Sequence, residues 1–68
     1  MRKQTLAENV AAYIEQNPDI NIQALINKLE AAYQEAYKMG NVLATYELRE
    51  AIDVAKSKLE DRSGNIAM

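Results

Sequence analysis

The strongest constraint on the fold of this chain is the apolar pattern between Ile22 and Met39. Apolar side chains recur there every three or four residues, and neither Gly nor Pro interrupts the run. This spacing is typical of an amphipathic helix, because it puts the apolar residues on one face. Asn21 is a favourable N-cap residue, so we predict a helix over about 21–39. Its apolar face would carry Ile22, Leu25, Ile26, Leu29, Ala32, Tyr33, Ala36 and Met39.

The two residues after this run predict how the chain continues. Gly40 can adopt the left-handed conformation that ends a helix, and Asn41 can cap a new one. So short a connection returns the next helix antiparallel to the first. We predict this helix over about 42–61, with a tail over 64–68. Its inner stripe would carry Ala44, Leu48, Ala51, Ile52, Ala55 and Leu59.

A shorter helix is predicted before the hairpin, over about 5–16. Thr5 and Glu8 have the spacing of a capping box, and Pro18 ends the helix because the residue before a proline is kept out of the α region. The predicted fold class is therefore all-α, with one domain over 1–68: a short N-terminal helix plus an antiparallel helical hairpin. The apolar stripe of the short helix would carry Leu6, Val10, Tyr13 and Ile14.

The composition limits both the stability and the chemistry of such a chain. A domain of 68 residues buries only about 60% of its unfolded surface, and small domains usually add disulfides, a metal or self-association. There is no Cys and no His, so disulfides, the usual zinc ligands and the commonest general base are all absent. Carboxylates such as Glu47 and Glu50 more often form a solvated face than a cation site. We predict no metal, no cofactor, no catalytic residue and no enzymatic activity.

The apolar arc of the 21–39 helix is wider than a single core requires. It spans about 160°, whereas about 100° is usual. The excess edge consists of Ile26, Tyr33 and Tyr37. We therefore predict self-association through these residues, with a dimer favoured, in which two hairpins form a four-helix-type bundle. The alternative is that the short N-terminal helix covers this edge in a monomer.

A second surface is predicted on the 42–61 helix. Tyr46 lies opposite the inner stripe at 100° per residue, and charged residues lie around it. Tyrosine flanked by charge is a frequent anchor at interfaces, although exposed tyrosines without a role are also common. The predicted partner-binding residues are Leu43, Tyr46, Arg49, Glu50 and Val54.

Three functions are compatible with these features. The leading prediction is a small non-enzymatic interaction protein that binds and modulates, or inhibits, another macromolecule, as phage and mobile-element regulators of this size do. One alternative is an oligomer that binds a small ligand or nucleotide, with Tyr33, Tyr37 or Tyr46 stacking on it. The other is a nucleic-acid-binding regulator, because residues 6–29 have helix–turn–helix order. The net charge of −2 argues against nucleic acid, since phosphate contacts dominate such binding.

The expected location is the cytoplasm, and no membrane contact is expected. No apolar run is long enough to cross a bilayer. Glu8 and Asn9 also interrupt the segment after the basic N-terminus, so no signal peptide is predicted.

The residues around the Gly40 turn resemble a single tetratricopeptide hairpin. The resemblance rests on Ala32-Tyr33, Ala36-Tyr37, Met39-Gly40-Asn41 and the step from Ala44 to Ala51. It departs from that family because Gly40 and Ala44 are one residue too close and no second repeat follows, although such repeats need neighbours to bury their faces. The resemblance therefore implies a helical hairpin and no peptide-binding groove.

Overall fold

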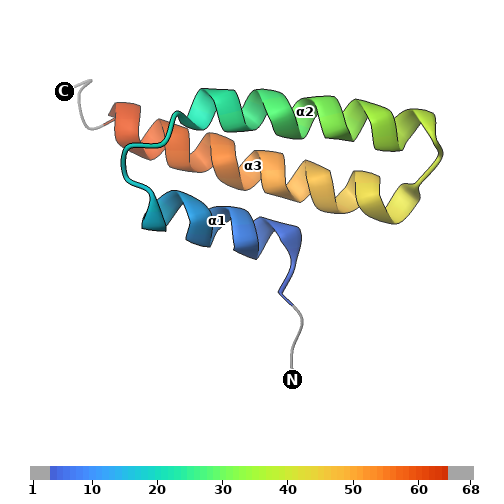
Figure 1. Cartoon of the computed structure of the whole chain (residues 1–68), viewed down its shortest axis with the longest axis horizontal. Helices are drawn as coiled ribbons and strands as arrows, with labels where there is room; N and C mark the ends of the chain where they lie inside the picture. The colour runs from blue at the N-terminus through green and yellow to red at the C-terminus, as the bar shows by residue number, and fades with distance from the viewer. Residues whose placement is uncertain (1–3, 65–68) are drawn as a thin grey trace.

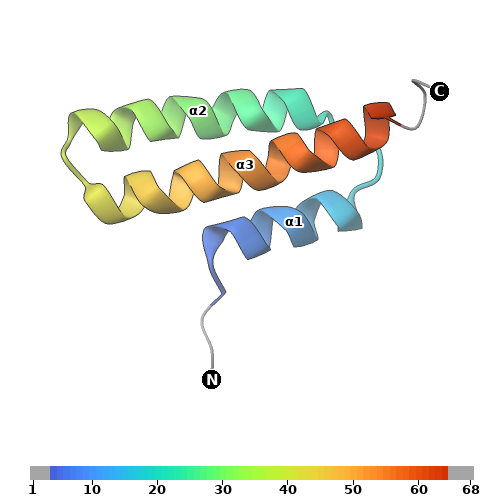
Figure 2. The same cartoon turned by 180° about the vertical axis from the view of Figure 1, so that it is seen from behind.

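A computed structural model of the chain describes residues 4–64, which contain three helices and no strand. The helices are α1 (Leu6–Gln16), α2 (Ile22–Lys38) and α3 (Val42–Gly64). The antiparallel hairpin of α2 and α3 is confirmed, and α1 lies along α3 at the end away from the Gly40 turn (Figure 1). The view from behind shows that α1 runs parallel to α3 and reaches only part of its length (Figure 2).

Local hydrogen bonds fix where α1 and α2 begin, as the sequence predicts. The Thr5 hydroxyl accepts from the Glu8 N–H at 3.2 Å, while the Glu8 carboxylate accepts from the Thr5 N–H at 3.0 Å. The capping box is thus complete. Asn21 caps α2 by accepting from the Ala24 N–H at 3.1 Å. These bonds satisfy N–H groups that have no partner inside the helix.

The Gly40 turn both ends α2 and begins α3. Gly40 has a φ of 73°, in the left-handed region that glycine adopts without steric cost. Its N–H donates to the Tyr37 carbonyl at 3.1 Å, and the Asn41 N–H donates to the Ala36 carbonyl at 3.0 Å. These two bonds form a Schellman motif. The Asn41 side chain then accepts from the Ala44 N–H at 3.1 Å and caps α3, so the two helices lie side by side.

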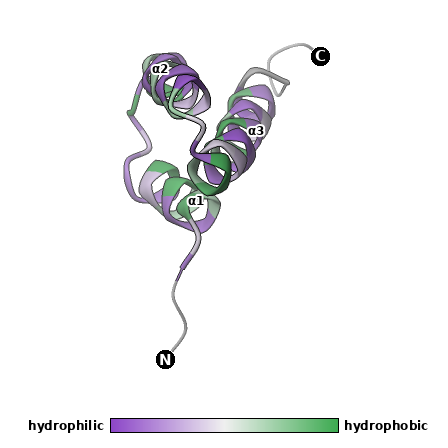
Figure 3. Ribbon diagram, turned by 90° about the vertical axis from the view of Figure 1, so that its right-hand side faces the viewer, coloured by the Kyte–Doolittle hydropathy of each residue, from purple (hydrophilic) through white to green (hydrophobic). Residues whose placement is uncertain are grey.

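The core lies where the three helices meet, and they stand at the corners of a triangle when viewed end-on (Figure 3). Within residues 4–62 no polar side chain is buried. Ala51 and Ala55 are fully buried on α3, and their small size allows the helices to pack closely. The buried residues are Val10, Ile14, Ile22, Ile26, Leu29, Ala36, Ala51, Ile52 and Ala55.

Three residues that were predicted on apolar inner faces are exposed instead. Tyr13 is 51% exposed because α1 packs mainly on α3, which leaves one flank of α1 uncovered. Met39 is 76% exposed because it is the C-cap of α2 at the turn of the hairpin, and α1 does not extend to that end (Figure 1). Ala32 lies on an uncovered flank of α2. Each error has the same cause: periodicity identifies an apolar face but not how much of it a neighbouring helix covers.

Polar contacts hold α1 on the last turns of α3. The Lys58 ammonium lies 2.9 Å from the Glu15 carboxylate. Arg62 donates to the backbone carbonyls of Ile14 at 3.3 Å and Pro18 at 3.0 Å. The last turn of α1 contains no basic residue, so Arg62 supplies from α3 the positive charge that favours a helix C-terminus.

The third helix is longer than predicted. It continues to Gly64 rather than ending near 61, and the contacts of Arg62 with α1 help to explain the added turn. Of the predicted tail, Gly64 is helical, and residues 65–68 lie outside the described residues. None of the helices described combines the length and hydrophobicity that a membrane crossing requires.

Candidate functional site

Exposed apolar side chains gather at the turn end of the hairpin. Within the described part of the chain, five of the six large apolar residues with the greatest exposure lie there, each between 68% and 77% exposed. They form what we call the hairpin-end surface: Tyr37, Met39, Val42, Leu43 and Tyr46. The sixth is Tyr13 on α1.

The length of α1 explains why this end of the hairpin is uncovered. α1 has 11 residues and α3 has 23, so at 1.5 Å per residue they are about 16 Å and 35 Å long. Because α1 is fixed to the last turns of α3 through Lys58 and Arg62, it cannot also cover the first turns. The chain is therefore three helices thick at one end and two at the other.

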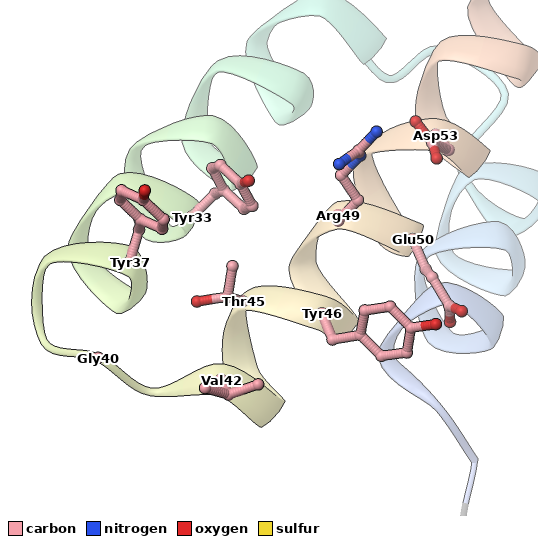
Figure 4. Close-up of a pocket in the computed structure, with 9 residues that line it drawn as sticks. All are labelled: Tyr33, Tyr37, Gly40, Val42, Thr45, Tyr46, Arg49, Glu50 and Asp53. Carbon is pink, nitrogen blue, oxygen red and sulfur yellow. The ribbon is translucent and has the colours of Figure 1, made fainter.

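A groove of about 610 Å³ lies on this two-helix part. Two tyrosines of α2 line one side and residues of α3 the other, with Arg49 and Thr45 facing the tyrosines across it (Figure 4). We call it the aromatic groove. Its lining residues are Tyr33, Tyr37, Gly40, Val42, Thr45, Tyr46, Arg49, Glu50 and Asp53.

The two α2 tyrosines form a stacked pair. Tyr33 and Tyr37 are one turn apart, and their rings are nearly parallel, with centroids 6.4 Å apart and an interplanar angle of 13°. This separation lies within the range of favourable offset stacking. Tyr33 packs against the core, whereas Tyr37 is 69% exposed. The pair therefore presents a supported aromatic surface to the groove.

The groove also contains charged side chains. Among the described residues, no ion pair or hydrogen bond is formed by the side chain of Arg49, Glu50 or Asp53. All three are exposed. The groove thus combines aromatic faces with one cation and two carboxylates. In the described part of the chain, the groove included, no group of three acidic side chains is placed to hold a metal ion together.

The structure buries one of the three predicted self-association residues and leaves the other two accessible in the groove. Ile26 is only 2% exposed and lies in the core of its own chain. It is therefore not part of an exposed edge, because it lies in a core cluster to which all three helices contribute. Tyr33 is half-buried and Tyr37 is exposed, and both line the aromatic groove.

Three of the five predicted partner-binding residues line the groove and two do not. Tyr46, Arg49 and Glu50 line the aromatic groove. Leu43 is 77% exposed on the hairpin-end surface but does not line the groove. Val54 is half-buried and lies outside both. Residues assigned from sequence to two separate surfaces are thus brought together in one groove.

Four groove residues were not among the predicted site residues: Gly40, Val42, Thr45 and Asp53. The length of the turn could have predicted the positions of Thr45 and Asp53. Because α2 ends and α3 begins within the Gly40 turn, the hairpin register places Tyr37 opposite Thr45, and Tyr33 one turn further along, opposite Arg49. Asp53 follows Arg49 by one turn on the same face of α3.

Comparison with known proteins gives no relative: no family model, curated protein or solved structure matches the chain. Its function is therefore inferred from its own surface. The arrangement of that surface offers stacking, hydrogen bonding and charge pairing at one end of the hairpin.

Proposed function

We propose that this is a small non-enzymatic interaction protein that binds another macromolecule through the hairpin-end surface and modulates it. The supporting observation is the gathering of five large apolar side chains, each at least 68% exposed, where α1 does not cover the hairpin. Single exposed apolar residues are ordinary on any protein, whereas a contiguous patch bordered by polar groups is typical of a binding face. Arg49 and Glu50 lie beside this patch and fit the polar rim of such an interface.

We also propose that the protein works as a homo-oligomer, with a dimer favoured. The core contains only aliphatic side chains, four of which lie on α2, and the chain contains no cysteine to reinforce it. Self-association is the remaining route by which so small a domain gains stability. A dimer that pairs two hairpins in a four-helix-type bundle would bury Tyr33 and Tyr37, while Ile26 is already buried.

Partner capture with matched variants tests the first proposal. The double variant Met39→Ser/Leu43→Ser changes two side chains of the hairpin-end surface, and Tyr13→Ser changes an exposed side chain on α1. None of the three residues is in the core, so all variants should keep the helical circular dichroism spectrum. We expect a protein that the wild type and Tyr13→Ser capture but the double variant loses. Equal capture by all three would refute binding through this surface.

A second function is favoured by the stacked tyrosines: binding of a flat anionic ligand such as a nucleotide. The groove volume of about 610 Å³ falls within the range of small-molecule sites, about 300–1,000 Å³. A base could stack on Tyr37 while Arg49 pairs with its phosphate. Thermal unfolding in the presence of a nucleotide panel tests this function, since a ligand at 100 times its Kd adds about 2.7 kcal/mol. A shift that Tyr37→Ser removes would favour it, and the absence of any shift would exclude these ligands.

A further inference from the structure

The outer face of α3 carries a row of side chains that would pair favourably with the same row of a second, antiparallel copy. Tyr46, Arg49, Asp53 and Lys56 follow one another at steps of three and four residues, which keeps them in one row along a helix. We call this row the α3 stripe. If the α3 of a second copy lies antiparallel, with the midpoint between its Arg49 and Asp53 opposite the same midpoint of the first copy, each Arg49 meets Asp53 of the other copy. Each Tyr46 then meets Lys56. Both pairings are attractive, the first as an ion pair and the second as a cation–π contact.

The α3 stripe is free to make these contacts. Tyr46 is 68% exposed, and Arg49 and Asp53 have no charged partner within residues 4–64. Lys56 has only a long contact with Glu30, at 3.9 Å, and both side chains are about half exposed. α1 does not interfere, because its contacts Lys58 and Arg62 lie about 140° to 180° around the helix from Arg49 and Asp53, at 100° per residue.

A hollow beside the stripe can receive the tyrosine of a second copy. It has a volume of about 390 Å³, and Tyr33, Ile52 and Lys56 are among the residues that line it. It adjoins the aromatic groove, with which it shares Tyr33, Arg49 and Asp53. In the antiparallel arrangement, Tyr46 of one copy arrives at Lys56 of the other, which places its ring at this hollow. The fit is reciprocal, as a two-fold interface requires.

We infer that two copies of the chain pair through the α3 stripe about a two-fold axis, with α3 against α3 at the centre of the dimer. The inference rests on the dimer of the proposed function and places the interface on a different face from the predicted edge of Ile26, Tyr33 and Tyr37, of which Ile26 is buried in each chain. α2 of each copy then flanks the pair, so the four hairpin helices form the bundle. Leu43 lies about 12 Å along α3 from the axis, at 1.5 Å per residue, and stays open to a macromolecular partner.

Charge reversal at two positions tests the pairing. Arg49→Asp places acidic residues at both 49 and 53, and Asp53→Arg places basic residues at both, so each variant alone faces its own like charges across the axis. When the two variants are mixed, every acidic residue faces a basic one. We expect each variant to dimerise at least about tenfold more weakly than the wild type, because two attractive contacts per dimer become repulsive. The equimolar mixture should recover a heterodimer of near wild-type affinity. Sedimentation velocity over a range of concentrations measures all four samples.

The control pair is Lys28→Asp and Glu35→Arg. These exposed residues of α2 give the same net charges as the test variants but lie outside the α3 stripe. Neither should weaken the dimer, and their mixture should gain nothing. A wild-type chain that stays monomeric, a dimer unaffected by Arg49→Asp, or a mixture that does not recover would each overturn the pairing. Loss of the dimer would leave capture of a partner through Met39 and Leu43 intact, so failure here is distinguishable from failure of the proposed function.

Discussion

Replacing Ile26 with alanine distinguishes between an exposed and a buried position of this side chain. On the exposed edge that the sequence predicts, its loss would cost a monomer little. In the structure it is 2% exposed among the core residues of all three helices. The substitution removes three carbons, each worth about 0.8 kcal/mol of transfer free energy when buried, and leaves a cavity. We therefore expect the free energy of unfolding to fall by about 3 kcal/mol.

Such a loss is large for this chain. At about 0.05–0.15 kcal/mol per residue, a domain of this size has a stability of about 3–10 kcal/mol, so Ile26→Ala should remove between about a third and all of it. Urea denaturation followed by far-ultraviolet circular dichroism, at several protein concentrations, measures the change. Tyr37→Ala is the matched control, because Tyr37 belongs to the same predicted edge but is 69% exposed. It should lose about 1 kcal/mol, mainly its stacking on Tyr33. Equal losses for the two variants would refute the burial of Ile26.

Three further predictions concern the polar contacts and the turn. Arg62→Gln should lower the free energy of unfolding by about 1 kcal/mol, measured by urea denaturation, because it removes the cation that caps the C-terminus of α1; an unchanged midpoint would contradict this role. The hydrogen bond from Lys58, and then its charge, lower the pKa of Glu15. This contact therefore stabilises the fold at pH above the ordinary glutamate pKa and is lost as the pH falls through the lowered value. In an NMR titration Lys58→Met should return the Glu15 pKa toward its ordinary range. Gly40→Ala should cost about 1 kcal/mol in thermal unfolding, since φ is 73° and a Cβ would meet nothing within 4 Å, so the cost is conformational alone; Gly40→Asn should cost less.

The helix ends were predictable because their causes are local. Thr5, Asn21 and Asn41 each cap a helix by accepting from an N–H three residues ahead. Gly40 ends α2 by a backbone conformation of its own. None of these interactions depends on a distant residue, so the residues and their spacing were sufficient. The end of α3 was predicted less well, and its last turns contain Arg62, whose partners Ile14 and Pro18 lie far away in the sequence.

The candidate site was only partly predictable. Tyr33, Tyr37 and Tyr46 stood out by their type and spacing, but the sequence assigned them to two surfaces. Their meeting in one groove follows from the register of the hairpin, which sets the residues of α2 opposite those of α3. The expectation that Ile26 lies on an exposed edge was wrong for a related reason, because an apolar arc does not reveal which part of it is covered.

The sequence by itself determined that this chain forms three helices, where α1 and α2 begin, and how α2 turns into α3. These are properties of hydrogen bonds and conformations within a few residues. Only the tertiary structure decided that α1 packs along the last turns of α3, through contacts such as Lys58 with Glu15. In that arrangement Ile26 lies in the core that the three helices share, and Tyr37 and Tyr46 stay exposed. The reason is physical: burial depends on where a second helix lies, and α1 is too short to cover both ends of the hairpin.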